Sequence, residues 1–106
     1  GLSKAEVISA HSGKVYDCYA VGFSPGFAYL GHLDEPLSQV GRLAEPRVSV
    51  PKGSVAIAAG QTAVYPSETP GGWHLIGTTE LNLLPPEGLR IEAGDKVVFK
   101  DVESRR

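Results

Sequence analysis

Glycine and proline interrupt the apolar stretches of this chain every few residues. The 106 residues include 13 glycines and 8 prolines, which separate short runs rich in valine, isoleucine, tyrosine and alanine. Because β-branched and aromatic residues favour strands while glycine and proline mark turns, the pattern is typical of many short strands joined by tight connections. We therefore expect a mainly β domain, an antiparallel barrel or sandwich with long loops and little helix. A chain of this length forms a single domain.

The start of the chain carries a helix signal. Ser3-Lys4-Ala5-Glu6 has the form of a capping box, in which Ser3 caps the helix and Glu6 reaches back to its amide. Val7, Ile8 and His11 continue a short helix, which Ser12-Gly13 ends. Since the sequence opens directly on this signal and contains no methionine, we interpret residues 1–106 as one domain of a longer protein.

Strand signals fill much of the remaining sequence. Strands are expected over residues 15–21, 54–59, 63–65, 74–76, 90–91 and 96–99, with weaker signals at 48–50 and 80–84. Gly60-Gln61 and Gly94-Asp95 are expected to form turns. Residues 23–53 are dominated by turn chemistry, and a long irregular segment in a compact domain is often functional. Residues 102–106 are expected to fray.

Charge and cysteine content exclude several classes of function. The net charge is −2 and the basic residues are scattered, so there is no electrostatic case for binding nucleic acid or an anionic membrane. The sequence has no signal peptide and no apolar run that would span a bilayer. The single cysteine, Cys18, lies in an apolar run and is expected to be a buried small hydrophobe. This usage suits a reducing cytoplasm.

No metal or nucleotide motif is present. His11, His32 and His74 are far apart in sequence and have no partner at metal-ligand spacing. Neither a Walker motif nor a GxGxxG motif occurs. We therefore expect no metal and no cofactor in this domain. Ser24 does not lie in a nucleophile elbow, so no catalytic residue is assigned.

A candidate binding site can be assembled from the aromatic and polar residues near the turns. The aromatic members can line a concave surface or fill the core, and core packing is the favoured interpretation of Phe23, Phe27 and Trp73. Arg47 offers a planar fork for a carboxylate or phosphate, and Gln61 offers an amide that donates and accepts. The alternative is that Arg47 pairs with Glu45 or Asp34 and that Gln61 satisfies turn backbone. The candidate substrate-binding residues are Arg47, Gln61, Tyr65, Tyr29, Phe23, Phe27, Trp73 and His32.

Several runs, in order, resemble the family of KipI and the B subunit of 5-oxoprolinase, also called allophanate hydrolase subunit 1 or carboxyltransferase subdomain C. They are Gly-Phe-Ser-Pro-Gly-Phe-Ala-Tyr-Leu-Gly at 22–31, Pro-Arg at 46–47, Val-Pro-Lys-Gly-Ser-Val-Ala-Ile-Ala at 50–58, Gly-Gln-Thr-Ala-Val-Tyr-Pro at 60–66 and Pro-Gly-Gly-Trp-His-Leu-Ile-Gly at 70–77. The resemblance implies a cyclophilin-like antiparallel β-barrel that forms the C-terminal domain of a two-domain protein.

The resemblance also implies a function. Many family members belong to an ATP-dependent 5-oxoprolinase, which opens 5-oxo-L-proline to L-glutamate and in which they act together with A and C subunits. The assembled complex uses the ATP, and the isolated domain is expected to be inactive. One branch instead inhibits a sensor histidine kinase and is countered by a KipA-like partner, the homologue of the C subunit. Both alternatives remain open at the level of sequence, as does a purely scaffolding role toward the C subunit.

Overall fold

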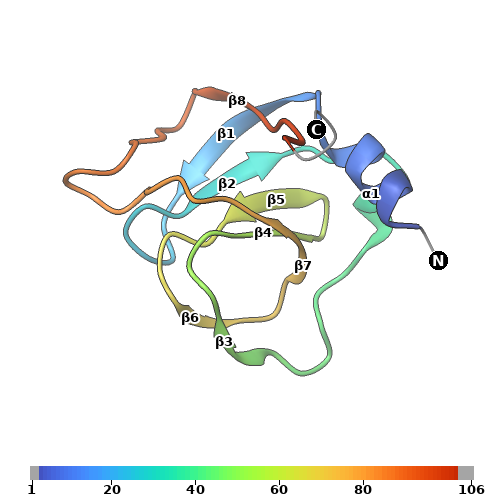
Figure 1. Cartoon of the computed structure of the whole chain (residues 1–106), viewed down its shortest axis with the longest axis horizontal. Helices are drawn as coiled ribbons and strands as arrows, with labels where there is room; N and C mark the ends of the chain where they lie inside the picture. The colour runs from blue at the N-terminus through green and yellow to red at the C-terminus, as the bar shows by residue number, and fades with distance from the viewer. Residues whose placement is uncertain (1–2, 103–106) are drawn as a thin grey trace.

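The computed structural model describes residues 3–102 as a mainly β fold with one short α-helix, as expected (Figure 1). The elements are α1 (Lys4–His11), β1 (Val15–Val21), β2 (Ala28–Gly31), the 3-10 helix η1 (Leu37–Gln39), β3 (Arg47–Val50), β4 (Ser54–Ala58), β5 (Gln61–Val64), β6 (Thr69–Gly71), β7 (His74–Thr78) and β8 (Lys96–Val98). Of the tail expected to fray, residues 103–106 lie outside the described residues.

The predicted capping box is confirmed at the start of α1. The backbone N–H of Glu6 donates to Ser3 Oγ over 3.2 Å, and the N–H of Ser3 donates to Glu6 Oε1 over 3.0 Å. The helix ends at His11, with Ser12 as its C-cap. Both ends therefore follow the local sequence signals.

The strands form two antiparallel sheets. The larger sheet has six strands in the order β7-β4-β5-β2-β1-β8, and the smaller one pairs β3 with β6. In Figure 1 the small sheet lies beneath the curved larger sheet, and α1 lies beside one end of the larger sheet. Strands β7 and β8 are the edges of the larger sheet, so hydrogen bonding leaves that sheet open and the closed barrel stays a prediction.

Side chains are buried on both faces of the larger sheet. All five residues of β4 are buried. Val55 and Ile57 join clusters on one face, with Leu30 and Leu83 among their members, while Ala56 and Ala58 join an aromatic cluster on the other. This alternation is the period-two pattern of a strand that is covered on both sides.

Alanines make room for the rings on the aromatic face. Ala56, Ala58 and Ala63 are completely buried, and they pack in one cluster with Phe27, Tyr65 and Trp73. Because interiors are packed to crystal-like density, small residues in the sheet are needed where large rings lie on it. We call this cluster, with the adjoining Tyr29 and Phe23, the aromatic face.

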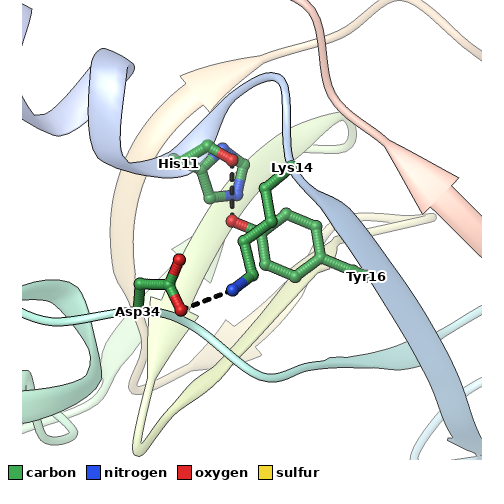
Figure 2. A network of polar contacts seen from close by, with 4 residues as sticks. All are labelled: His11, Lys14, Tyr16 and Asp34. Atoms are coloured by element: carbon green, nitrogen blue, oxygen red, sulfur yellow. Dashed lines mark hydrogen bonds and ion pairs between the residues drawn. The ribbon is translucent and has the colours of Figure 1, made fainter.

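Two polar contacts fasten α1 and the following turn to the sheet (Figure 2). The hydroxyl of Tyr16, a fully buried residue of β1, donates to the backbone oxygen of His11 over 2.7 Å. The ammonium of Lys14 pairs with a carboxylate oxygen of Asp34 over 2.5 Å. The end of the helix is thereby fixed to both β1 and the loop after β2.

The structure corrects several sequence-based expectations. Residues 28–31, inside the segment expected to be irregular, form β2, because a short apolar run pairs with β1 and β5 despite its flanking glycines. Residues 80–84 are not a strand: the N–H of Leu84 bonds to the Asn82 side chain, and two prolines follow at 85–86. Residues 90–91 are not a strand either.

The turn between β4 and β5 also differs from expectation. Ala59 and Gly60 both have positive φ, +50° and +82°, which is the backbone of a two-residue type I′ hairpin. Ala58 pairs with Gln61 across this turn. Gln61 is therefore the first residue of β5, and its side chain has a strand's fixed direction.

Candidate functional site

Four of the predicted aromatic residues surround a fifth, Phe27. Ring centroids lie 5.2 Å from Phe27 for Phe23, 5.0 Å for Tyr29, 5.5 Å for Tyr65 and 5.7 Å for Trp73, all close to edge-to-face. Such geometry sets the positive edge of one ring against the negative face of the next and stabilises each pair by about 0.5–1.5 kcal/mol. The aromatic face is thus a rigid platform.

Burial divides these aromatics into two kinds. Phe27 and Trp73 are buried, which confirms the core-packing interpretation for both. Phe23 is 64% exposed and has φ of +68°, so core packing is wrong for this residue. The backbone of the turn after β1 presents its ring to solvent in a conformation that costs a non-glycine residue about 1–2 kcal/mol.

The backbone of Arg47 lies one strand pairing away from the hydroxyl end of Tyr65. It begins β3 and pairs with Gly71 of β6, and Gly71 lies against the Tyr65 hydroxyl so closely that a Cβ would overlap it. Arg47 is exposed and makes no ion pair within residues 3–102. The alternative pairing with Asp34 or Glu45 is therefore absent, and the Asp34 carboxylate is held by Lys14 instead.

Gln61 and His32 meet at a residue that sequence reasoning missed, Tyr19. The Gln61 Nε2 donates to the Tyr19 hydroxyl oxygen. The Tyr19 and His32 rings are stacked with centroids 5.6 Å apart and planes 2° from parallel. Tyr19 is the extra residue of a bulge, since Cys18 pairs with Leu30 and Ala20 with Tyr29. Bulges re-aim side chains, and no local sequence signal marks this one.

Tyr29 lies within electrostatic range of both Tyr19 and Tyr65. Burial raises the pKa of Tyr19 and of Tyr65, and the phenol of Tyr29 contributes to both shifts. A hydrogen bond from the Trp73 backbone and the charge of Arg42 partly oppose the rise in the pKa of Tyr65. Arg42 was not among the predicted site residues. The Gln61 amide thus lies at Tyr19, and the Arg42 guanidinium acts on Tyr65 at the other side of Tyr29.

A cleft lies to one side of the aromatic face. It has a volume of about 710 Å³ and runs between the 22–27 turn and residues 83–92. Phe23 and Phe27 line it, whereas the other six predicted site residues do not. Phe27 is therefore shared between the wall of this cleft and the aromatic face.

The chemistry of a metal or thiol centre is not assembled here. Among residues 3–102 no three His, Cys, Asp or Glu side chains are grouped as metal ligands. Cys18 is buried, as predicted, and burial raises the pKa of its thiol, which makes it a poor nucleophile. No helix in the described part of the chain is long and apolar enough to cross a membrane.

Comparisons with known proteins give this β domain its class. Residues 1–90 match the family model described as carboxyltransferase domain, subdomain C and D, and the chain belongs to this family. It is 50% identical to the B subunit of 5-oxoprolinase from Escherichia coli O157:H7 over 102 residues, which are 93% of this chain and 46% of that protein. It is 44% identical to the B subunit of 5-oxoprolinase from Bacillus subtilis over 107 residues, 98% of this chain and 44% of that protein.

Solved structures agree with the fold. A protein of Pyrococcus horikoshii, PH0987, superposes with a TM-score of 0.86 at 45% identity over 96% of this chain and 48% of that one. TTHA0988 superposes with a TM-score of 0.86 at 38% identity over 96% of this chain and 21% of that one. The resemblance to the B-subunit family of 5-oxoprolinase is therefore confirmed. The chain spans about half the length of the curated relatives it matches.

Proposed function

We propose that this chain is the C-terminal domain of the B component of an ATP-dependent 5-oxoprolinase. In this reaction water adds across the lactam C–N bond of 5-oxo-L-proline and yields L-glutamate, and ATP hydrolysis activates the otherwise stable carbonyl. The observation that carries the proposal is the 44–50% identity to proteins named as B subunits of 5-oxoprolinase over most of this chain. The A and C subunits complete the enzyme, the complex uses the ATP, and this domain holds no cofactor.

The aromatic face and its polar rim are the proposed substrate surface. The exposed guanidinium of Arg47 has no competing carboxylate within residues 3–102, which leaves it for the carboxylate of 5-oxoproline. Gln61 and the phenol of Tyr65 orient the lactam amide. The exposed ring of Phe23 and the half-buried ring of Tyr29 form the apolar wall, which the buried rings of Phe27 and Trp73 support from within the core. His32 borders the Gln61 end. Arg42 supplies a second positive charge beside Tyr65.

Residues 1–106 would form a cyclophilin-like barrel, the C-terminal domain of a two-domain cytoplasmic protein. Packing supports closure, because Ile76 of β7 and Phe99, just after β8, both pack against the cluster of Val55, Val64 and Leu83. Side chains at the two edges of the sheet thus share one core. The N-terminal half of the protein and the partner subunits supply the remaining surfaces.

Turnover in the reconstituted complex tests this function. The full-length parent is combined with its A and C partners, and ATP-dependent conversion of 5-oxoproline to glutamate is measured for wild type, Arg47→Ala and Gln61→Ala. Loss of a charge-assisted carboxylate contact predicts a roughly 10-fold or greater fall in kcat/KM for Arg47→Ala. Wild-type turnover that survives both substitutions would move the substrate site elsewhere in the complex. No turnover in the wild type would reject the enzyme assignment.

One observation favours a second function, inhibition of a sensor histidine kinase. Phe23 and Val21 are 64% and 55% exposed at the mouth of the 710 Å³ cleft, and exposed apolar patches mark partner sites. In this alternative the patch docks on the kinase, and a KipA-like protein displaces it. Inhibition of kinase autophosphorylation that Phe23→Ser abolishes would support the alternative. Unchanged autophosphorylation in the presence of the full-length protein would reject it.

A further inference from the structure

The amide of Gln61 is only partly used by the protein itself. Its Nε2 donates one hydrogen bond, to the hydroxyl oxygen of Tyr19, and within residues 3–102 it makes no other. A glutamine amide has two N–H donors and one carbonyl acceptor. Since the side chain is partly exposed at the start of β5, one N–H and the Oε1 oxygen remain available to a ligand.

Tyr19 is held in place by its surroundings. The bulge in β1 sets the direction of its side chain. The ring lies over Gly31, where a Cβ would come within 3.0 Å of Tyr19 Cε1. His32 stacks on the ring. A phenol fixed by backbone, a glycine and a stacked ring is a hydrogen-bond partner of defined position for the Gln61 amide.

The free edge of the Gln61 amide matches a lactam. A five-membered ring forces its amide into the cis form, so that the C=O and N–H groups point to the same side. One N–H and one C=O on the glutamine can then pair with that edge in two hydrogen bonds. We propose that Tyr19 is a positioning residue that orients Gln61 to read the cis-amide edge of a lactam, an inference that rests on the proposed 5-oxoprolinase function.

The role of Tyr19 follows from the symmetry of the amide. Rotation of the terminal torsion by half a turn exchanges the oxygen and nitrogen of glutamine, which have nearly the same shape. The Tyr19 oxygen accepts a hydrogen bond from Nε2. It therefore holds the amide by Nε2 and leaves Oε1 for the ligand. Because the phenol can also donate, the lactam N–H, which needs Oε1 as its acceptor, selects this orientation on binding. Preorganisation of this kind lowers the entropy lost when the ligand binds.

Two small lactams measure this recognition separately from turnover. The full-length protein is titrated with 2-pyrrolidone and with N-methyl-2-pyrrolidone, which lacks the N–H, and dissociation constants are obtained by ligand-observed NMR. In the wild type 2-pyrrolidone should bind about 10-fold or more tightly than its N-methyl analogue, because an unpaired amide acceptor is costly. Tyr19→Phe keeps the ring and its stack on His32, and it should reduce this ratio several-fold. Gln61→Ala should bring the ratio close to one.

The ratio of the two dissociation constants distinguishes a positioning role of Tyr19 from a purely structural one. Partial loss of fold or of ring packing would weaken the binding of both lactams equally and leave the ratio of their dissociation constants unchanged. The control Val98→Ala, on the exposed edge strand β8, should change neither dissociation constant. An unchanged ratio in Tyr19→Phe, or no preference for 2-pyrrolidone in the wild type, overturns the inference. Its failure is distinct from that of the proposed function, because 5-oxoproline turnover by the reconstituted complex is measured independently. If the protein prefers 2-pyrrolidone but the complex does not convert 5-oxoproline, lactam recognition would stand and the 5-oxoprolinase assignment would be rejected.

Discussion

The imidazole Nε2 of His11, at the end of α1, lies 2.8 Å from the hydroxyl oxygen of Thr62, a fully buried residue of β5. Thr62 gives its single hydroxyl proton to the backbone oxygen of Ala56 over 3.0 Å. The hydrogen in the first contact must therefore come from His11, which fixes the neutral tautomer with the proton on Nε2. A buried polar chain thus ties the N-terminal helix to the centre of the large sheet.

Removal of the His11 ring should destabilise the fold substantially. The ring is buried and packs at centroid distances of 5.5 Å from Tyr16 and 4.6 Å from Phe99. His11→Ala leaves a cavity and removes the hydrogen bond to Thr62, which together should lower the free energy of unfolding by about 2–4 kcal/mol. Urea denaturation measures the change. His32→Ala, at an exposed histidine, should cost less than about 1 kcal/mol, and equal losses in the two variants would contradict the assignment.

The same histidine should make stability depend on mildly acidic pH. Burial lowers the pKa of His11 from 6.5 to about 4. Between these values the unfolded chain binds a proton that the folded chain does not, so stability is fully present above pH 6.5 and falls as the pH drops toward 4. The total loss is about 3 kcal/mol.

Urea midpoints at about pH 7, 6 and 5 measure this slope. The variant His11→Gln cannot titrate and should show a flatter profile over the same range. The pKa of Glu6 is lowered from 4.5, chiefly by the backbone hydrogen bond to Ser3, so protonation of the capping box belongs to lower pH. Identical slopes in wild type and His11→Gln would assign the acid sensitivity to other groups.

Phe27 and Phe23 should differ sharply in their contribution to stability. Phe27 is 3% exposed at the centre of the aromatic face, while Phe23 is 64% exposed. Phe27→Ala should cost about 3–5 kcal/mol, because it opens a cavity beneath four rings. Phe23→Ala should cost less than about 1 kcal/mol. Thermal unfolding of the two variants compares them directly, and similar losses would mean that the 22–27 turn packs differently.

Gly71 should resist even a methyl group. A Cβ at Gly71 would overlap the Tyr65 hydroxyl, whereas at the neighbouring Gly72 the nearest atom, in Pro46, is 3.9 Å away. Gly71→Ala should therefore destabilise the fold by about 1–3 kcal/mol, while Gly72→Ala should be nearly neutral. Chemical denaturation of this matched pair tests the close approach of β6 to Tyr65. Equal stability of the two variants would show that Tyr65 moves aside without cost.

Local signals predicted the elements that depend on local chemistry. The capping box at Ser3 and Glu6 gave both the existence and the start of α1. The β-branched and aromatic run at 15–21 matched β1 to the residue. Strand β2 was missed because it is short, follows Gly26 closely and ends in Gly31. Its pairing with β1 and β5 is a long-range contact that no window of sequence contains.

The candidate site, too, depends on long-range contacts that local sequence does not reveal. The aromatic residues were identified from their places beside turns, and the structure brings five of them together at Phe27. Tyr19 was missed because it lies in a strand, and only the bulge directs it toward Gln61. Arg42 approaches Tyr65 through folding of the loop after η1, where the N–H of Leu43 bonds to the oxygen of Gly72 over 2.7 Å. A contact of this kind has no signature in local composition.

The most direct test of the account is the initial rate of glutamate formation from 5-oxoproline by the reconstituted three-component complex. The wild-type full-length protein is compared with Arg47→Ala and with the control Val98→Ala, each verified as folded by circular dichroism. The account predicts ATP-dependent turnover that falls at least about 10-fold in kcat/KM with Arg47→Ala and is retained in the control. Equal rates in all three would contradict a substrate site on this domain.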